Sequence, residues 1–229
     1  KNEFVTITSH ELRTPMSAIR GSLSTILEGY AGDINADVRE FLTAAYNENE
    51  RLLRLVNNLL NISRIESGRF TFTIGTVNIQ KNIIQVVKDL ESSAREKHIT
   101  LSYDNTEDLP QVLGDEDKLH EVLINIIGNA IKYTHQGGVT VKAVKNDDMV
   151  IVSVTDTGSG IAPQDQMRLF KKYSQVSRDY SRPAGGTGLG LYICKSIIEG
   201  LKGNIWLDSA VGRGSTFYFS LPIAGSDTL

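Results

Sequence analysis

The sequence predicts two regions of different fold: a helical hairpin over residues 1–67 and an α/β sandwich over residues 68–229. Three observations support this division. Apolar residues recur at helical spacing from residue 2 to residue 66, and strand-like and helix-like segments alternate from residue 69 onward. A glycine-rich polar stretch then occupies residues 157–187, and connecting segments of that length usually serve a function, so we expect a lid there.

The hairpin region consists of two periodic runs separated by residues 29–33 (GYAGD), where two glycines suit a turn. The second run ends near residues 66–68 (ESG), and Gly68 is a good helix-terminating residue. Two long helices with a short connection pack antiparallel. Because two helices alone cannot enclose a core, we expect the hairpin to dimerise into a four-helix bundle.

The second region is predicted to have a mostly antiparallel sheet. Strands are expected at 70–74, 99–103, 139–144, 149–155, 203–208 and 215–222, and helices at 79–96, 115–134 and 189–201. Residues 145–148 (KNDD) join two of these strands as a predicted β-hairpin.

Composition restricts the function classes. The 229 residues are 40% hydrophobic and 22% charged with a net charge of −3, so no basic excess points to nucleic acid or an anionic membrane surface. The single cysteine, Cys194, excludes an intrachain disulfide and suits a reducing cytosol. No apolar run approaches the ~20 residues of a membrane-spanning helix. The chain begins with Lys1 rather than Met, so we expect a fragment of a longer protein.

Residues 9–15 (SHELRTP) place His10 opposite the apolar side of the first helix, next to Glu11 and four residues before Thr14. A neighbouring carboxylate can accept a proton from one imidazole nitrogen and raise the nucleophilicity of the other, which suits a phosphoryl acceptor. Taken alone, however, an exposed His or Thr on a helix is more often simply solvated.

The helix predicted at 115–134 carries a polar stripe beside its apolar face, formed by Asn125, Asn129, Lys132 and Tyr133. Amide oxygens can hold Mg²⁺, a Lys can meet phosphates, and a Tyr ring can lie against a base. Without further context, such residues are more often ordinary surface residues.

Two glycine-rich strings follow. In residues 156–161 (DTGSGI), the Asp156 carboxylate can accept a hydrogen bond from the exocyclic amine of adenine, and the glycines allow close backbone approach. Residues 185–191 (GGTGLGL) lead into a helix, where backbone N–H groups can approach phosphates. The second string is neither a P-loop nor a dinucleotide-binding fingerprint.

In this order the motifs resemble those of the sensor histidine kinases of two-component systems. Residues 9–15 resemble the H box, and the polar stripe, DTGSGI and GGTGLGL resemble the N, G1 and G2 boxes. Residues 169–170 stand in the place of the F box, and residues 212–217 (GRGSTF) resemble the last glycine motif. The resemblance covers essentially the whole chain. It implies the ATP-binding fold shared with gyrase, the heat-shock ATPase chaperones and the mismatch-repair ATPases.

The resemblance also implies roles for particular residues. His10 would accept the γ-phosphate of ATP, Glu11 would assist it, and Thr14 would act in dephosphorylating a regulator. Asn125 and Asn129 would hold Mg²⁺, Lys132 the phosphates, and Tyr133 and Asp156 the adenine. The other implied nucleotide-binding residues are Gly158, Gly160, Phe170, Gly186, Thr187, Gly188, Leu189 and Gly190.

One segment departs from the family pattern. Residues 170–175 (FKKYSQ) put Gln175 where many members have an Arg that is thought to help at the γ-phosphate. Lys171, Arg178 and Arg182 are the alternative candidates for that cation.

The resemblance implies a homodimer, a response-regulator partner with an acceptor Asp, and a cytoplasmic fragment whose membrane anchor, where one exists, lies upstream. Two other functions fit parts of the pattern: an ATPase clamp of the same superfamily and a non-catalytic dimeric scaffold. The H box argues against the clamp, and the intact Asn129, Asp156 and glycines argue against the scaffold.

Overall fold

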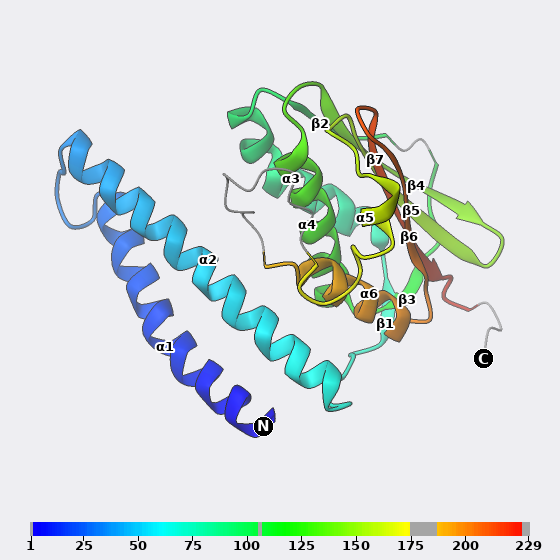
Figure 1. The fold of residues 1–229 in the computed structure, drawn as a ribbon, viewed down its shortest axis with the longest axis horizontal. Helices are drawn as coiled ribbons and strands as arrows, with labels where there is room; N and C mark the ends of the chain where they lie inside the picture. Colours follow the sequence, from blue (N-terminus) through cyan, green and yellow to red (C-terminus); the bar gives the residue numbers. More distant parts are fainter. Residues whose placement is uncertain (1, 105–106, 175–186, 226–229) are drawn as a thin grey trace. The chain divides into compact units, whose positions relative to one another are not determined.

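The computed structural model describes residues 2–104, 107–174 and 187–225. The chain forms two compact units, which divide between Phe70 and Thr71, whereas the sequence placed a boundary between residues 67 and 68. The described elements (Figure 1) are α1 (Asn2–Leu27), α2 (Ala36–Glu66), β1 (Gly75–Val77), α3 (Ile79–Glu96), β2 (Thr100–Tyr103), β3 (Val112–Gly114), α4 (Glu116–Tyr133), β4 (Gly138–Asn146), β5 (Met149–Asp156), α5 (Pro163–Gln166), α6 (Gly190–Gly200), β6 (Ile205–Ala210) and β7 (Gly214–Pro222).

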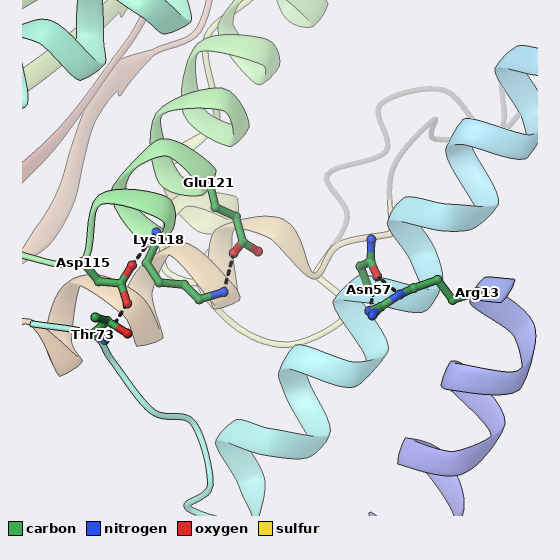
Figure 2. Close-up of polar contacts among 6 residues, drawn as sticks. All are labelled: Arg13, Asn57, Thr73, Asp115, Lys118 and Glu121. Carbon is green, nitrogen blue, oxygen red and sulfur yellow. Dashed lines mark hydrogen bonds and ion pairs between the residues drawn. The ribbon is translucent and has the colours of Figure 1, made fainter. Parts of the chain in front are cut away.

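Helices α1 and α2 form the first unit and run antiparallel, as predicted. Near the turn, Nη1 of Arg39 donates to the carbonyl of Leu27 at 2.8 Å, so the start of α2 meets the end of α1. Far from the turn, the Arg13 guanidinium donates to Asn57 Oδ1 (Figure 2). The side chain of Asn35 caps α2 by accepting a hydrogen bond from the Val38 N–H at 2.8 Å.

The hairpin leaves large apolar side chains exposed to solvent. The exposed fractions are 47% for Leu12, 53% for Ile19, 77% for Phe41, 51% for Leu52 and 42% for Leu59. The chain therefore carries an apolar surface on both helices of the hairpin.

The second unit is built on a five-stranded sheet in the order β2-β4-β5-β7-β6. Strands β2 and β4 are parallel and the other three pairings are antiparallel, which confirms the predicted sheet. Helices α3, α4 and α6 cover one face of this sheet (Figure 1). Apolar side chains at this interface are fully buried, among them Ile83, Leu123, Ile127, Val152, Ile193, Ile197 and Phe219.

The prediction of a strand at residues 70–74 was wrong. These residues have no assigned strand; instead β1 follows them and pairs with β3, a three-residue strand that the sequence pattern did not predict. The backbone N–H of Thr73 donates to Oδ2 of Asp115 at 2.7 Å (Figure 2), and the Phe72 ring packs against Gly200. A side-chain carboxylate thus takes the N–H group that a strand would have offered to a neighbouring strand.

Cys194 lies on α6 and is completely buried. Burial raises the pKa of its thiol far above the ordinary value, because the thiolate would lose its hydration. In the part of the chain that the structure describes, no helix is long and apolar enough to cross a membrane.

Candidate active site

The residues of the predicted H box lie on α1. The side chains of Glu11 and Thr14 are exposed, and their spacing places them about one turn apart on the helix. The backbone of His10 is part of α1, whereas its side chain falls outside the described residues.

Two polar contacts fix α1 against α2 on either side of Pro15. Before it, Nε and Nη2 of Arg13 donate to Oδ1 of Asn57 at 3.1 and 2.6 Å. After it, the buried Asn49 donates from Nδ2 to the carbonyl of Met16 at 2.9 Å. Because Pro15 has no N–H to give to the helix, these contacts hold the stretch that its ring weakens. Neither asparagine was predicted from the sequence, because local spacing carries no signal for partners 44 and 33 residues apart.

The polar stripe lies on α4. This helix begins after Asp115, whose Oδ1 accepts a hydrogen bond from the Lys118 N–H at 3.1 Å. Asn125, Asn129 and Lys132 are half-buried at the edge of the apolar face, and Tyr133 is 52% exposed. Nζ of Lys132 lies 5.0 Å from the centre of the Tyr133 ring.

Asp156 ends β5 and is buried, with 5% of its surface exposed. Its Oδ1 accepts a hydrogen bond from the Gly158 N–H at 2.8 Å, and the backbone of Ser215 also donates to the carboxylate. Burial raises the pKa of Asp156, and these two backbone donors partly offset the rise by favouring the ionised form. The last glycine motif therefore contributes directly to holding the Asp156 side chain.

Gly158 brings the ends of β5 and α4 together. A Cβ at this position would lie 2.5 Å from the Tyr133 carbonyl oxygen and 2.7 Å from Oδ1 of Asp156. Only glycine allows so close an approach of the two backbones. Thr157, which lies between Asp156 and Gly158 in sequence, donates from its hydroxyl to the Gln136 carbonyl at 2.9 Å. The same hydroxyl accepts a hydrogen bond from the Gly138 N–H at 3.0 Å, a contact that was not predicted from the sequence.

The second glycine string leads into α6 next to α4. A Cβ on Gly190 would collide with the side-chain amide of Asn125, so the two predicted residues are in direct contact. The Leu189 N–H donates to Oγ1 of Thr187 at 3.2 Å, and Gly188 has a φ of +68°, which favours glycine. Gly186 lies outside the described residues.

The remaining predicted residues belong to the segment expected to be a lid, of which the structure describes residues 157–174 and 187. Gly160 backs onto the carbonyl of Ala210 at the end of β6, and Phe170 is half-buried beyond the short helix α5. Of the cations considered for the γ-phosphate, Lys171 is exposed, whereas Arg178 and Arg182 fall outside the described part of the chain, as does Gln175.

Two family models match the chain in the order of its two units. Residues 1–68 match the His Kinase A (phospho-acceptor) domain, and residues 114–225 match the histidine kinase-, DNA gyrase B- and HSP90-like ATPase family. The chain belongs to the sensor histidine kinases.

Similarity to individual kinases extends over nearly the whole chain. It is 36% identical to the circadian input-output histidine kinase CikA of Synechococcus elongatus and 35% identical to the sensor histidine kinase WalK of Bacillus subtilis. Each match covers 97% of this chain but only 30% and 36% of those proteins, so the chain spans about a third of the curated relatives' length.

Solved kinase structures have the same fold. The full-length ShkA structure in complex with AMPPNP has a TM-score of 0.79 and 31% identity, over 99% of this chain and 47% of that one. The Acinetobacter baumannii histidine kinase AdeS has a TM-score of 0.66 and 26% identity, over 94% of this chain and 98% of that one. Both the predicted hairpin and the predicted α/β sandwich of this kinase core are thereby confirmed.

Proposed function

We propose that this kinase core transfers the γ-phosphate of ATP to its own His10 and then passes it to the acceptor Asp of a response regulator. The observation that carries the proposal is the adjacent pair His10 and Glu11 on α1, within a segment that matches the phospho-acceptor family.

In the proposed step, one imidazole nitrogen of His10 attacks the γ-phosphorus while the bond from that phosphorus to the β–γ bridging oxygen breaks. ADP leaves with the bonding electron pair. The lone pair of the attacking nitrogen forms the new phosphorus–nitrogen bond. Glu11 accepts the proton from the other ring nitrogen, which raises the nucleophilicity of the attacking nitrogen and leaves the phosphoimidazole with no additional positive charge. Phosphoryl transfer mainly needs alignment and charge neutralisation, which suits a helix-borne His presented to a nucleotide.

We assign residues 68–229 to nucleotide binding and residues 1–67 to dimerisation and phosphotransfer. Asp156 fits the adenine amine, because it is a buried carboxylate held by backbone donors. Tyr133 offers a half-exposed ring for the base, and Lys132 offers a cation for the phosphates. Gly158, Gly160, Phe170 and residues 186–190 would complete the cradle, consistent with the AMPPNP bound by the similar ShkA.

Amide oxygens are suitable ligands for a hard divalent cation, so Asn125 and Asn129 would hold Mg²⁺. The cation would neutralise phosphate charge as it develops during transfer. The exposed apolar surface of the hairpin supports a homodimer, since a second hairpin of the same kind could cover it. We assign regulator dephosphorylation to Thr14, because it lies one turn beyond His10 and its hydroxyl can orient a water molecule.

The test is incubation with γ-labelled ATP and Mg²⁺. A kinase gives a labelled chain, an ATPase clamp gives only free phosphate, and a scaffold gives neither. The label should be acid-labile and base-stable, as a phosphorus–nitrogen bond is. His10→Gln should abolish it while the affinity for ATP stays within about twofold, because the substitution lies in a different unit from the nucleotide residues. Acid-stable label on the wild-type chain would contradict the assignment of His10.

A further inference from the structure

Lys97 makes an unusual set of contacts at the end of α4. It is the C-cap residue of α3, and its Nζ donates to the carbonyl oxygens of Ile131 at 2.8 Å, Lys132 at 2.7 Å and Thr134 at 3.2 Å. A lysine ammonium has three protons to donate. These three backbone carbonyls therefore use its whole donor capacity.

The contacts supply what the end of a helix lacks. The last carbonyls of α4 have no further turn to bond to. The carbonyl of Ala130 is satisfied locally, because Thr134 donates to it from its N–H at 3.1 Å and from its hydroxyl at 2.8 Å. The next two carbonyls, those of Ile131 and Lys132, receive their hydrogen bonds from Lys97.

The position of Lys97 also places its charge at the ends of two helices. Near the start of α3, Asn82 donates to the carbonyl of Glu116 at 3.2 Å and contacts Nδ1 of His120 at 3.0 Å, so the first turns of α3 and α4 lie together. The two helices thus run in the same direction, and their C-termini meet at Lys97. The C-terminus of a helix carries a partial negative charge, which a nearby ammonium stabilises.

The turn that Lys97 holds is the one that bears the proposed base and phosphate contacts. It contains Lys132 and Tyr133, and the Tyr133 carbonyl lies against Gly158. We propose that Lys97 is a positioning residue for the nucleotide: by holding the carbonyls around Tyr133, it sets the directions of the Lys132 side chain and the Tyr133 ring. This proposal rests on the proposed function of the second unit.

The competing explanation is that Lys97 only stabilises the fold or adds a distant positive charge. A residue with a purely structural role would lower the melting temperature of the chain without changing the affinity of the folded protein for nucleotide. A distant charge would affect ATP but not adenosine, which carries no phosphate. A positioning residue should affect both ligands, because the Tyr133 ring would face the base.

The experiment measures ATP and adenosine affinities of the whole 229-residue chain by calorimetry, well below the melting temperature. Lys97→Met should lower the affinities for ATP and for adenosine about tenfold, because the turn that directs Lys132 and Tyr133 would lose its charged hydrogen-bond donor. Lys97→Arg should recover part of both losses, because it restores the charge and several donors. Lys88→Met, on an exposed position of the same helix, removes the same charge and should change adenosine affinity by less than about twofold.

Loss of ATP affinity with unchanged adenosine affinity would overturn the proposal in favour of a charge effect. Unchanged affinities for both ligands in a folded Lys97→Met chain would overturn it in favour of a structural role. If that variant does not fold, Lys97→Gln, which keeps an amide donor, is subject to the same criteria. A wild-type chain that binds no ATP would instead overturn the proposed function itself, and this inference with it.

Discussion

The two units of this kinase core use their apolar residues in opposite ways. In the hairpin, Phe41 is 77% exposed and Leu52 is 51% exposed, whereas in the α/β unit Phe219 and Leu123 have no exposed surface. The α/β unit therefore encloses its own core, while the hairpin leaves apolar surface that another molecule can cover. We therefore expect the stability of the α/β unit to depend on its own core, and the stability of the hairpin to depend also on the proposed dimerisation.

The units also differ in how their candidate functional residues are brought together. On α1, His10, Glu11 and Thr14 fall within two turns of one helix. The candidate nucleotide residues come from α4, β5 and the start of α6, and close backbone approaches at Gly158 and Gly190 join them. A change at one of these α1 residues should therefore alter one chemical step, whereas a change at a candidate nucleotide residue should alter binding.

The largest effect should come from separating two activities on the hairpin. Thr14→Ala should slow dephosphorylation of a phosphorylated regulator about 10²–10⁴-fold, the usual contribution of a group that orients water, and leave autophosphorylation intact. Glu11→Gln is the matched control and should instead slow phosphorylation of His10. The measurement is decay of the phosphorylated regulator with excess kinase and ADP. Decay at the wild-type rate in Thr14→Ala would show that another residue supplies any phosphatase activity.

A charge placed on the exposed apolar surface should affect assembly of the hairpin and leave the core of the α/β unit unchanged. Leu52→Asp should weaken dimerisation of residues 1–67 by about 100-fold or more, because burying an unpaired charge costs about 3–5 kcal/mol. The control is Asn47→Asp, which adds the same charge at an exposed polar position of α2. Sedimentation of both variants checks this prediction. A wild-type hairpin that sediments as a stable monomer would contradict the predicted four-helix bundle.

In the α/β unit, Asp156→Asn should weaken ATP binding about 10- to 150-fold, the loss expected for a hydrogen bond to a charged group of about 1.5–3 kcal/mol. The variant should keep its stability at neutral pH. Because the pKa of Asp156 is raised in the folded chain, its ionisation at neutral pH lowers the free energy of unfolding, and the uncharged Asn removes that cost. Wild-type protein should also discriminate against GTP, whose base presents a carbonyl in place of the amine. Asp208→Asn, an exposed change on β6, serves as the control. Equal ATP and GTP affinities would assign Asp156 another role.

The smallest effect should be a pH dependence of that same affinity. In its proposed role Asp156 binds the adenine amine as the ionised carboxylate, and its pKa in the free protein lies above that of an ordinary aspartate. Affinity should therefore be highest above this raised pKa and fall as the pH drops through it, by at most about tenfold per pH unit. Titration of ATP affinity with pH in wild type and Asp156→Asn separates this effect from protonation of the ligand. Identical profiles for the two proteins would exclude Asp156 as the titrating group.

Long periodic segments allowed the fold to be predicted well. The helix expected at 79–96 coincides with α3, and the hairpin expected around residues 145–148 joins β4 and β5. Short segments were harder, because three-residue strands such as β1 and β3 contain too few residues for a pattern. The strand expected at 70–74 failed because Asp115, far along the chain, binds the Thr73 N–H.

The residues of the candidate site were likewise predictable only where the signal is local in the sequence. Motif strings located Asp156 and the glycines, because the required residue types lie close together in sequence. Asn57 and Lys97 were missed, since their contacts join residues more than 30 positions apart. Periodicity and local spacing carry no information on such pairs, and only the folded chain brings them into contact.

The burial of Cys194 provides a probe of how the α/β unit opens. It is the only thiol in the chain, and α6, which carries it, begins at Gly190 beside Asn125. A thiol reagent can modify it only in molecules in which α6 has moved away from the sheet, so the rate of modification under native conditions reports the population of that opened state. Nucleotide that binds only the closed form would slow modification by the factor 1 + [L]/Kd. The native cysteine thus allows ligand affinity and local opening to be measured together without a label engineered into the protein.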